Sequence, residues 1–128
     1  PILCVGETEE ERKEGQTEER IGSEIRTALF ALSKEETAKM VIAYEPIWAI
    51  GSGQAATPKD AEEIASFIRK TVKEAAGKKA ADEVRILYGG SVNGDNISHF
   101  MKQKNIDGAL IGGASLKPDT MIDIYNKA

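Results

Sequence analysis

One glutamate stands where an acidic side chain is costly unless it has a task. Glu45 closes the apolar run 40–44 and is followed by Pro46, with Trp48 close behind. A carboxylate at the end of an apolar strand costs free energy unless it has a partner. Pro46 fixes the next φ angle and Trp48 offers an apolar wall, which together would raise the pKa of Glu45 toward that of a general base. Two interpretations stay open at this point, a catalytic base or a surface glutamate in a salt bridge.

The segment after Glu45 has the composition of a hinged lid. It comprises Pro46, Ile47, Trp48, Ala49, Ile50, Gly51, Ser52 and Gly53. Proline at one end and Gly-Ser-Gly at the other are typical of hinges, whereas the middle is apolar. A loop that always faces solvent has little reason to carry such side chains, but a lid that buries them on closing does. Closing lids exclude water from reactions with labile intermediates.

Two further strand ends are rich in glycine. Residues 89–91 read Gly-Gly-Ser and residues 112–115 read Gly-Gly-Ala-Ser. Glycine lets the backbone approach a ligand and direct N–H groups at an anion, and a helical turn at 114–116 would add its positive end. Two such loops in succession fit a phosphate site after the last two strands of a barrel. The alternative is two tight turns.

Three other reactive side chains have weaker claims to a site. His99, the only histidine, falls within a helical stretch, which predicts a surface or packing role. Cys4 lies in mid-strand with no histidine near it in sequence, which favours a buried, unreactive thiol. The acidic run 7–14 is predicted to be a solvated loop and helix face, of which Glu7 could reach the site. We expect neither a metal nor a cofactor.

Four strand-then-helix units would position these residues. Strands are predicted at 2–5, 40–44, 85–88 and 109–111, and helices are predicted from about Thr17, after Thr57, around 97–101 and from about Pro118. The predicted buried helix positions are Ile21, Ile25, Ala28, Leu29, Leu32, Ile64, Phe67, Ile68, Val72, Ala75, Ile97, Phe100, Met101, Met121, Ile122 and Tyr125. Strict alternation implies the α/β class and a parallel sheet, either half of an eight-stranded barrel or a small open sheet.

Length and composition narrow the classes of function. The 128 residues form one predicted unit, 1–128, whereas a complete barrel takes about 250 residues. A net charge of −4 argues against nucleic acid or acidic membranes as partners. One cysteine and no long apolar run predict a cytoplasmic protein without a membrane span. The chain begins at Pro1, directly on a strand, as if a preceding segment had been removed.

Taken together, the motifs resemble the triose-phosphate isomerase family. Residues 43–53 resemble its glutamate-and-lid signature, and residues 86–92 and 112–116 resemble its two phosphate-binding loops. Residues 1–7 resemble its fifth strand, and the similarity covers the whole chain in the family's order. The resemblance implies four βα units that form the C-terminal half, strands five to eight, of a TIM (β/α)8 barrel.

The resemblance also implies a role for each motif. Glu45 would shuttle a proton between the two carbons of dihydroxyacetone phosphate and glyceraldehyde 3-phosphate through an enediolate, a reaction of glycolysis and gluconeogenesis. Backbone N–H groups of four residues would bind the phosphate: Gly51, Ser91, Gly112 and Gly113. The remaining implied roles are a closed-lid latch at Tyr88 and Ser91, a clamp on Glu45 from Ile50 and Leu110, and an open-lid hold on Trp48 by Glu7. Ser52 stands where many members have threonine and keeps the hydroxyl.

By the same resemblance, part of the site is missing. The family also uses a lysine, a neighbouring asparagine and a histidine from the half that precedes the fifth strand, and His99 does not match that histidine. Without the lysine and histidine the enediolate lacks a strong stabiliser, and loss of one such donor costs about a hundredfold or more in rate. We therefore expect little activity from the chain alone. Its expected partners are the phosphorylated triose and either the missing N-terminal half or a second copy at exposed strand edges; the alternative is a non-catalytic half barrel that self-associates.

Overall fold

The computed structural model describes residues 1–128 and contains one parallel sheet. Its strands, in both sequence and spatial order, are β1 Ile2–Val5, β2 Val41–Tyr44, β3 Arg85–Tyr88 and β4 Gly108–Ala109. The register pairs Leu3 with Ile42 and Ile42 with Ile86. The predicted α/β class, the parallel sheet and the half-barrel arrangement of four βα units are confirmed.

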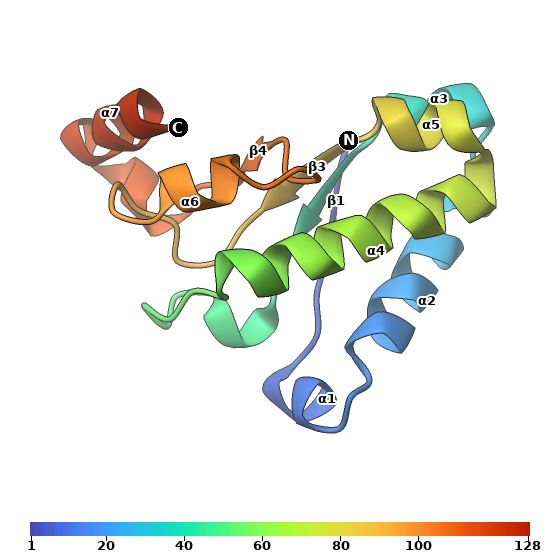
Figure 1. Cartoon of the computed structure of the whole chain (residues 1–128), viewed down its shortest axis with the longest axis horizontal. Coiled ribbons are helices and arrows are strands. Elements are labelled where there is room, and N and C mark those ends of the chain that lie inside the picture. The colour runs from blue at the N-terminus through green and yellow to red at the C-terminus, as the bar shows by residue number, and fades with distance from the viewer.

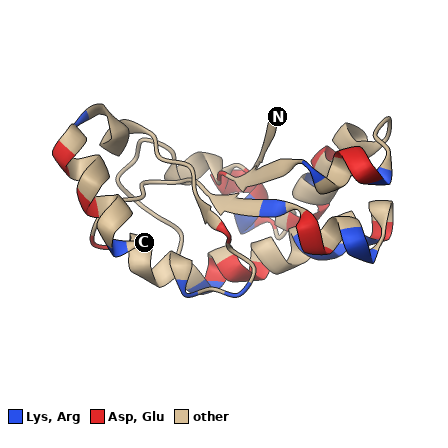
Figure 2. Ribbon diagram, turned by 90° about the horizontal axis from the view of Figure 1, so that it is seen from above, with Lys and Arg blue, Asp and Glu red and all other residues tan.

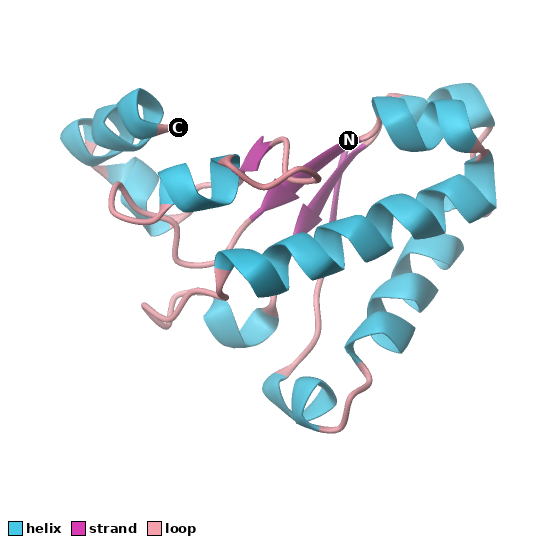
Figure 3. Cartoon of the chain, viewed as in Figure 1, coloured by secondary structure: helices cyan, strands magenta, loops and turns pink.

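Helices connect the strands and follow the last one (Figure 1, Figure 3). They are α1 Glu9–Lys13, α2 Thr17–Leu29, α3 Lys34–Ala38, α4 Pro58–Ala76, α5 Lys78–Glu83, α6 Ile97–Met101 and α7 Pro118–Lys127, with 3-10 turns η1 Ile47–Ala49 and η2 Gly113–Leu116. The prediction missed α1, α3 and α5, because helices this short give no apolar period. Capping boxes at Thr8 with Glu11 and at Ser33 with Glu36 are the local signal for α1 and α3.

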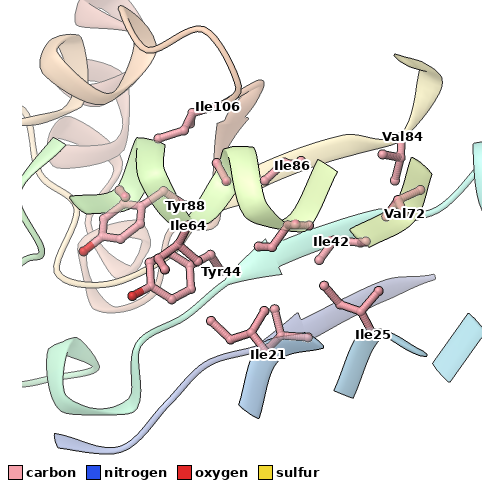
Figure 4. Close-up of a cluster of buried hydrophobic side chains, with 14 of the residues drawn as sticks. Ile21, Ile25, Ile42, Tyr44, Ile64, Val72, Val84, Ile86, Tyr88 and Ile106 are labelled. Atoms are coloured by element: carbon pink, nitrogen blue, oxygen red, sulfur yellow. The ribbon is translucent and has the colours of Figure 1, made fainter. Parts of the chain in front are cut away.

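The core lies between one face of the sheet and helices α2, α4 and α6 (Figure 4). Alternate strand residues point to this face, so Ile42, Tyr44, Ile86 and Tyr88 are buried there. The ring of Tyr88 also stacks on Phe100 of α6, with centroids 4.2 Å apart. A helix layer packed on a strand layer buries the apolar face of each, which is what holds the four units together.

Cys4 points away from this core and is exposed. The prediction of a buried thiol is therefore wrong. Cys4 falls in the alternate set of strand residues, with Ile2 and Arg85, which are also exposed. In a closed barrel this set of residues faces the interior. Here Ile2, Cys4 and Arg85 are exposed, whereas Ala43, the strand partner of Cys4, is buried.

The last helix also differs from the prediction. Met121, Ile122 and Tyr125 are exposed rather than buried, with Tyr125 at 79%, and Ile124 is the buried residue of α7. The main neighbours of α7 are η2 and α6, and β4 is only two residues long. A strand this short offers too little surface to cover the apolar side of the helix. On α4, Ala75 is likewise exposed and Ala76 is buried in its place.

Charged residues of both signs are spread over the helices (Figure 2). None of the helices combines the length and the apolar character needed to cross a membrane. No group of three or more His, Cys, Asp or Glu side chains is arranged to hold a metal ion.

One arginine joins α4 to the segments on either side of β3. Arg69 Nη1 donates to the carbonyls of Ala81 and Val84 at 2.6 and 3.1 Å, and Nε donates to Asn105 Oδ1 at 3.1 Å. Its Nη2 pairs with Asp107 Oδ2 at 2.9 Å. Asp107 Oδ2 in turn accepts from the backbone N–H of Ile86 in β3 at 2.8 Å. The Arg69 side chain is 20% exposed and that of Asp107 38%, so the bonds to Ala81, Val84 and Asn105 are partly buried and the ion pair is open to solvent.

Replacement of Arg69 by methionine is expected to lower the free energy of unfolding by about 3 kcal/mol, because it leaves the partly buried carbonyls of Ala81 and Val84 and the side-chain oxygen of Asn105 without a donor. Urea unfolding followed by circular dichroism measures the loss. The matched control is Arg26→Met on α2, where an exposed arginine has no ion pair; a surface change of this kind costs about 0.5 kcal/mol or less. Equal losses in the two variants would show that the network around Arg69 contributes nothing.

Candidate functional site

Glu45 follows β2 directly and lies at the carboxyl end of the sheet. Its backbone N–H donates to the carbonyl of Val5 at 2.8 Å, which extends the parallel pairing by one residue. Its side chain lies against Gly89, where an added Cβ would come within 2.8 Å of Oε1 and 2.9 Å of Cγ. The missing side chain at position 89 therefore makes the space that the carboxylate occupies.

The carboxylate of Glu45 opens into a cleft of about 420 Å³. The cleft is lined by Glu45, Ile50, Gly51, Gly53, Gly90, Ser91, Val92, Asn93, Leu110, Gly112, Gly113 and Ala114. The structure thus brings the predicted base, the four predicted phosphate residues and the predicted clamp residues Ile50 and Leu110 to one place. A cleft of about 470 Å³ lies elsewhere, by α3 and α5, but it contains none of the predicted site residues.

The backbone N–H groups of the four predicted phosphate residues have no acceptor within the chain. In η2, the carbonyl of Gly112 is fixed by both the N–H and the hydroxyl of Ser115, at 2.9 and 2.7 Å. Free N–H groups from neighbouring loops form the kind of concavity that holds phosphate.

Ser91 has the only positive φ among the non-glycine residues, +56°. Its hydroxyl donates to the carbonyl of Ala49 at 2.7 Å, and its own carbonyl accepts from Asn96 Nδ2 at 3.0 Å. An added Cβ at Gly90 would lie 2.8 Å from Tyr88 Oη, so the loop is packed closely. A left-handed serine is an unfavourable conformation that persists when its surroundings enforce it, and such residues gather at ligand sites.

Glu7 is buried at the centre of a hydrogen-bond network and does not line the cleft. The residue is 0% exposed, and its Oε1 accepts from Tyr44 Oη at 3.1 Å, Trp48 Nε1 at 3.1 Å and Arg12 Nη1 at 3.4 Å. Its Oε2 has no partner. Burial and the adjacent Glu7 charge raise the pKa of Tyr44, which keeps its hydroxyl a donor. Sequence reasoning found Glu7 and Trp48 but missed Tyr44 and Arg12.

Residues 46–53, the predicted lid, are tied down near their start. The N–H of Ile47 donates to the carbonyl of Glu7 at 2.9 Å, and Ala49 is buried. Ile47 and Ile50 are exposed. Gly51 and Gly53 both have positive φ, +64° and +75°, which glycine adopts without strain.

The far end of the same segment is also tied. Tyr88 Oη accepts from the N–H of Ala56 at 2.8 Å and donates to the carbonyl of Gly90 at 3.0 Å. The resemblance assigns the Trp48–Glu7 contact to an open lid and the contacts of Tyr88 and Ser91 to a closed lid. In this structure the Trp48–Glu7 contact occurs together with the hydrogen bonds of Ser91 to Ala49 and of Tyr88 to Ala56. Ser52 bonds only within the loop, to Gln54, and stays exposed. Both ends are fixed while the tip projects into solvent.

Cys4 and His99 relate differently to the site. Partial burial and the neighbouring Glu45 carboxylate raise the pKa of the Cys4 thiol, so it stays protonated beside the predicted base. His99 is exposed on α6 and does not line the cleft. No lysine, arginine or histidine lines the cleft either, so a negative charge that develops on a bound molecule meets backbone N–H groups but no cation from this chain.

Comparison with known proteins agrees with this arrangement. A family model described as "Triosephosphate isomerase" matches residues 1–128. The triosephosphate isomerase of Dictyoglomus turgidum is 52% identical over 124 residues, which are 97% of this chain and 50% of the relative. The triosephosphate isomerase of Dictyoglomus thermophilum has the same identity and coverage. The chain therefore spans about half the length of the curated relatives it matches.

Proposed function

Because the chain belongs to the triosephosphate isomerase family, we propose that it supplies the C-terminal half of a barrel that interconverts dihydroxyacetone phosphate and glyceraldehyde 3-phosphate. The observation that carries the proposal is that Glu45 lines the same cleft as four residues whose backbone N–H groups have no backbone acceptor. A carboxylate and an anion cradle within one small cleft suit proton transfer on a small phosphorylated molecule.

In the proposed reaction Glu45 takes a proton from one carbon of the triose and returns it to the neighbouring carbon. The electron pair left behind forms an enediolate, whose negative charge needs donors that this chain does not bring to the cleft. The lysine and histidine of the missing half would supply them. The N–H groups of Gly51, Ser91, Gly112 and Gly113 would hold the phosphate and so fix the reacting carbons against Glu45.

The lid roles follow from the same cleft. Closure of residues 46–53 would bury Ile50 against Leu110 and exclude water from Glu45, which favours proton transfer over loss of the intermediate. Tyr88 and Ser91 would hold the closed segment, and Glu7 would hold Trp48 when the lid is open. The Ser91–Ala49 and Trp48–Glu7 hydrogen bonds are both present in the observed position of the segment, so both groups reach residues 46–53. The assignment of each contact to one lid position follows from the resemblance to the family.

The proposed partner is the missing N-terminal half. Strands β1 and β4 each have one unpaired edge, and Cys4 on the second sheet face is exposed, as expected of half a closed barrel. The same edges favour a second candidate, a non-catalytic half barrel that pairs with a copy of itself. A cytoplasmic location also belongs to the proposal, since a free exposed thiol at Cys4 suits a reducing compartment.

Complementation tests the proposal. The chain alone is expected to show little isomerase turnover. Mixed and refolded with the amino-terminal half of the Dictyoglomus turgidum relative, it should form a one-to-one complex and gain activity of about a hundredfold or more, because the complex restores the missing donors. A coupled isomerase assay and size-exclusion chromatography with light scattering measure the two outcomes.

The same samples decide between the candidates. A stable dimer of the chain that excludes the added half and stays inactive would favour the non-catalytic half barrel. Appreciable turnover by the chain alone that survives His99→Ala and is lost in Glu45→Gln would contradict the proposed need for the other half.

A further inference from the structure

Arg12, on α1, makes three contacts with groups from three different parts of the chain. Its guanidinium carbon lies 4.9 Å from the centroid of the Trp48 ring, within the range of a cation–π interaction. Nη1 lies 3.4 Å from Glu7 Oε1, and Nη2 lies 3.1 Å from Asp60 Oδ2. The Arg12 side chain is 34% exposed, so these contacts are partly shielded from solvent.

The contacts of Arg12 join two residues outside the predicted lid, Glu7 and Asp60, to one residue within it, Trp48. Glu7 follows β1, Asp60 lies in the first turn of α4, and Trp48 lies in η1. Helix α1 is itself fixed at its start by the capping box of Thr8 and Glu11, so Arg12 is not on a free loop. A planar guanidinium can accept a ring on its face while its N–H groups bond two carboxylates at the edge, which the lysine ammonium cannot do.

We propose that Arg12 is a positioning residue for the lid. It holds the Trp48 ring in the orientation in which the indole N–H reaches Glu7, and it thereby sets how readily residues 46–53 leave the observed position. The inference rests on the proposed role of those residues as a lid.

The electrostatics of Glu7 explain why an arginine is needed at this point. The Glu7 carboxylate is fully buried, Oε2 has no partner, and Arg12 is the only cation paired with it. Arg12 can keep its bonds to Glu7 and Asp60 whatever the position of the lid. Trp48, by contrast, loses both the guanidinium face and the Glu7 acceptor when it moves. Arg12 thus stabilises the observed position of residues 46–53 without itself having to move.

Trp48 is the only tryptophan, so its spectroscopic signals report this contact directly. In Arg12→Met, we expect the population of displaced Trp48 to rise about two- to fivefold, the range of a partly exposed cation–π contact. Acrylamide quenching of Trp48 fluorescence should increase, and the single indole N–H resonance in a ¹H–¹⁵N spectrum should shift and exchange faster with water. Arg12→Lys keeps the positive charge but lacks the planar guanidinium, so it should change the quenching and the indole resonance by an intermediate amount.

Lys13→Met is the matched control. It removes the same charge from the same helix, but Lys13 is exposed and pairs with Glu9 rather than with Trp48. Its Trp48 signals should equal those of the unaltered chain. The proposal is overturned if Arg12→Met is folded by circular dichroism with unchanged quenching and indole resonance, or if Lys13→Met produces the same changes.

Two further outcomes remain decisive. If Arg12→Met does not fold, unchanged Trp48 signals in folded Arg12→Lys overturn the proposal, and an increase in quenching supports it. These measurements use the 128-residue chain without substrate or a second half. Suppose that Arg12→Met changes the Trp48 signals but the complemented barrel is inactive. This result would reject the proposed isomerase function and would still support Arg12 as the residue that positions Trp48.

Discussion

Replacement of Glu45 by glutamine is expected to lower the kcat of the complemented barrel by about a thousandfold or more, within the range for loss of a general base. Glutamine has nearly the shape of glutamate and can occupy the space over Gly89, but its amide does not accept the substrate proton. The cleft and its free N–H groups are unchanged. Binding of inorganic phosphate should therefore stay within about twofold of the unaltered complex, because only the proton-transfer step is removed.

The measurement is a full kinetic analysis of the complex, with kcat and KM separated, together with a phosphate titration. Glu63→Gln is the control, since it makes the same chemical change at an exposed position on α4, away from the cleft. It should leave kcat and KM unaltered. Retention of more than about a tenth of kcat by Glu45→Gln would mean that another group is the base, because loss of a general base costs at least a hundredfold.

The parts of the site that could be predicted from sequence are those that depend on strand ends. Glu45, the two glycine loops and residues 46–53 each follow an apolar run, and parallel strands bring their carboxyl ends to one edge. The cleft that joins Glu45 to Gly51, Ser91 and Gly112 has this origin. The roles of these residues remain predictions until activity and phosphate binding are measured.

The parts that could not be predicted depend on contacts across the chain. Arg12 lies in an acidic run that predicts a solvated surface, and only the tertiary structure brings it to Trp48. Tyr44 reads as one more apolar strand residue until its hydroxyl meets Glu7. Cys4 and Tyr125 were misplaced because periodicity predicts which residues share a face and not whether a second layer covers that face.

Gly6 shows how closely the backbone is packed behind the candidate base. A Cβ built on Gly6 would overlap the carbonyl oxygen of Glu45 and lie 2.6 Å from its carbonyl carbon and 3.2 Å from the nitrogen of Pro46. All three atoms belong to the backbone, so no side chain can rotate away to relieve the contact. The two strand ends must separate instead, and with them the segment that carries both Glu45 and the start of the lid.

Gly6→Ala is therefore expected to lower the free energy of unfolding by about 3 kcal/mol, the upper end of the usual cost of overpacking. Gly22→Ala on α2 is the matched control, because its Cβ would meet only the far end of the flexible Arg26 side chain, at 3.0 Å. Within a helix the same substitution should instead stabilise the chain, by about 0.5–1 kcal/mol. Urea unfolding of the two variants compares identical chemical changes with opposite expected signs. Should both shift stability in the same direction by similar amounts, close approach at Gly6 would not be what fixes Glu45 against β1.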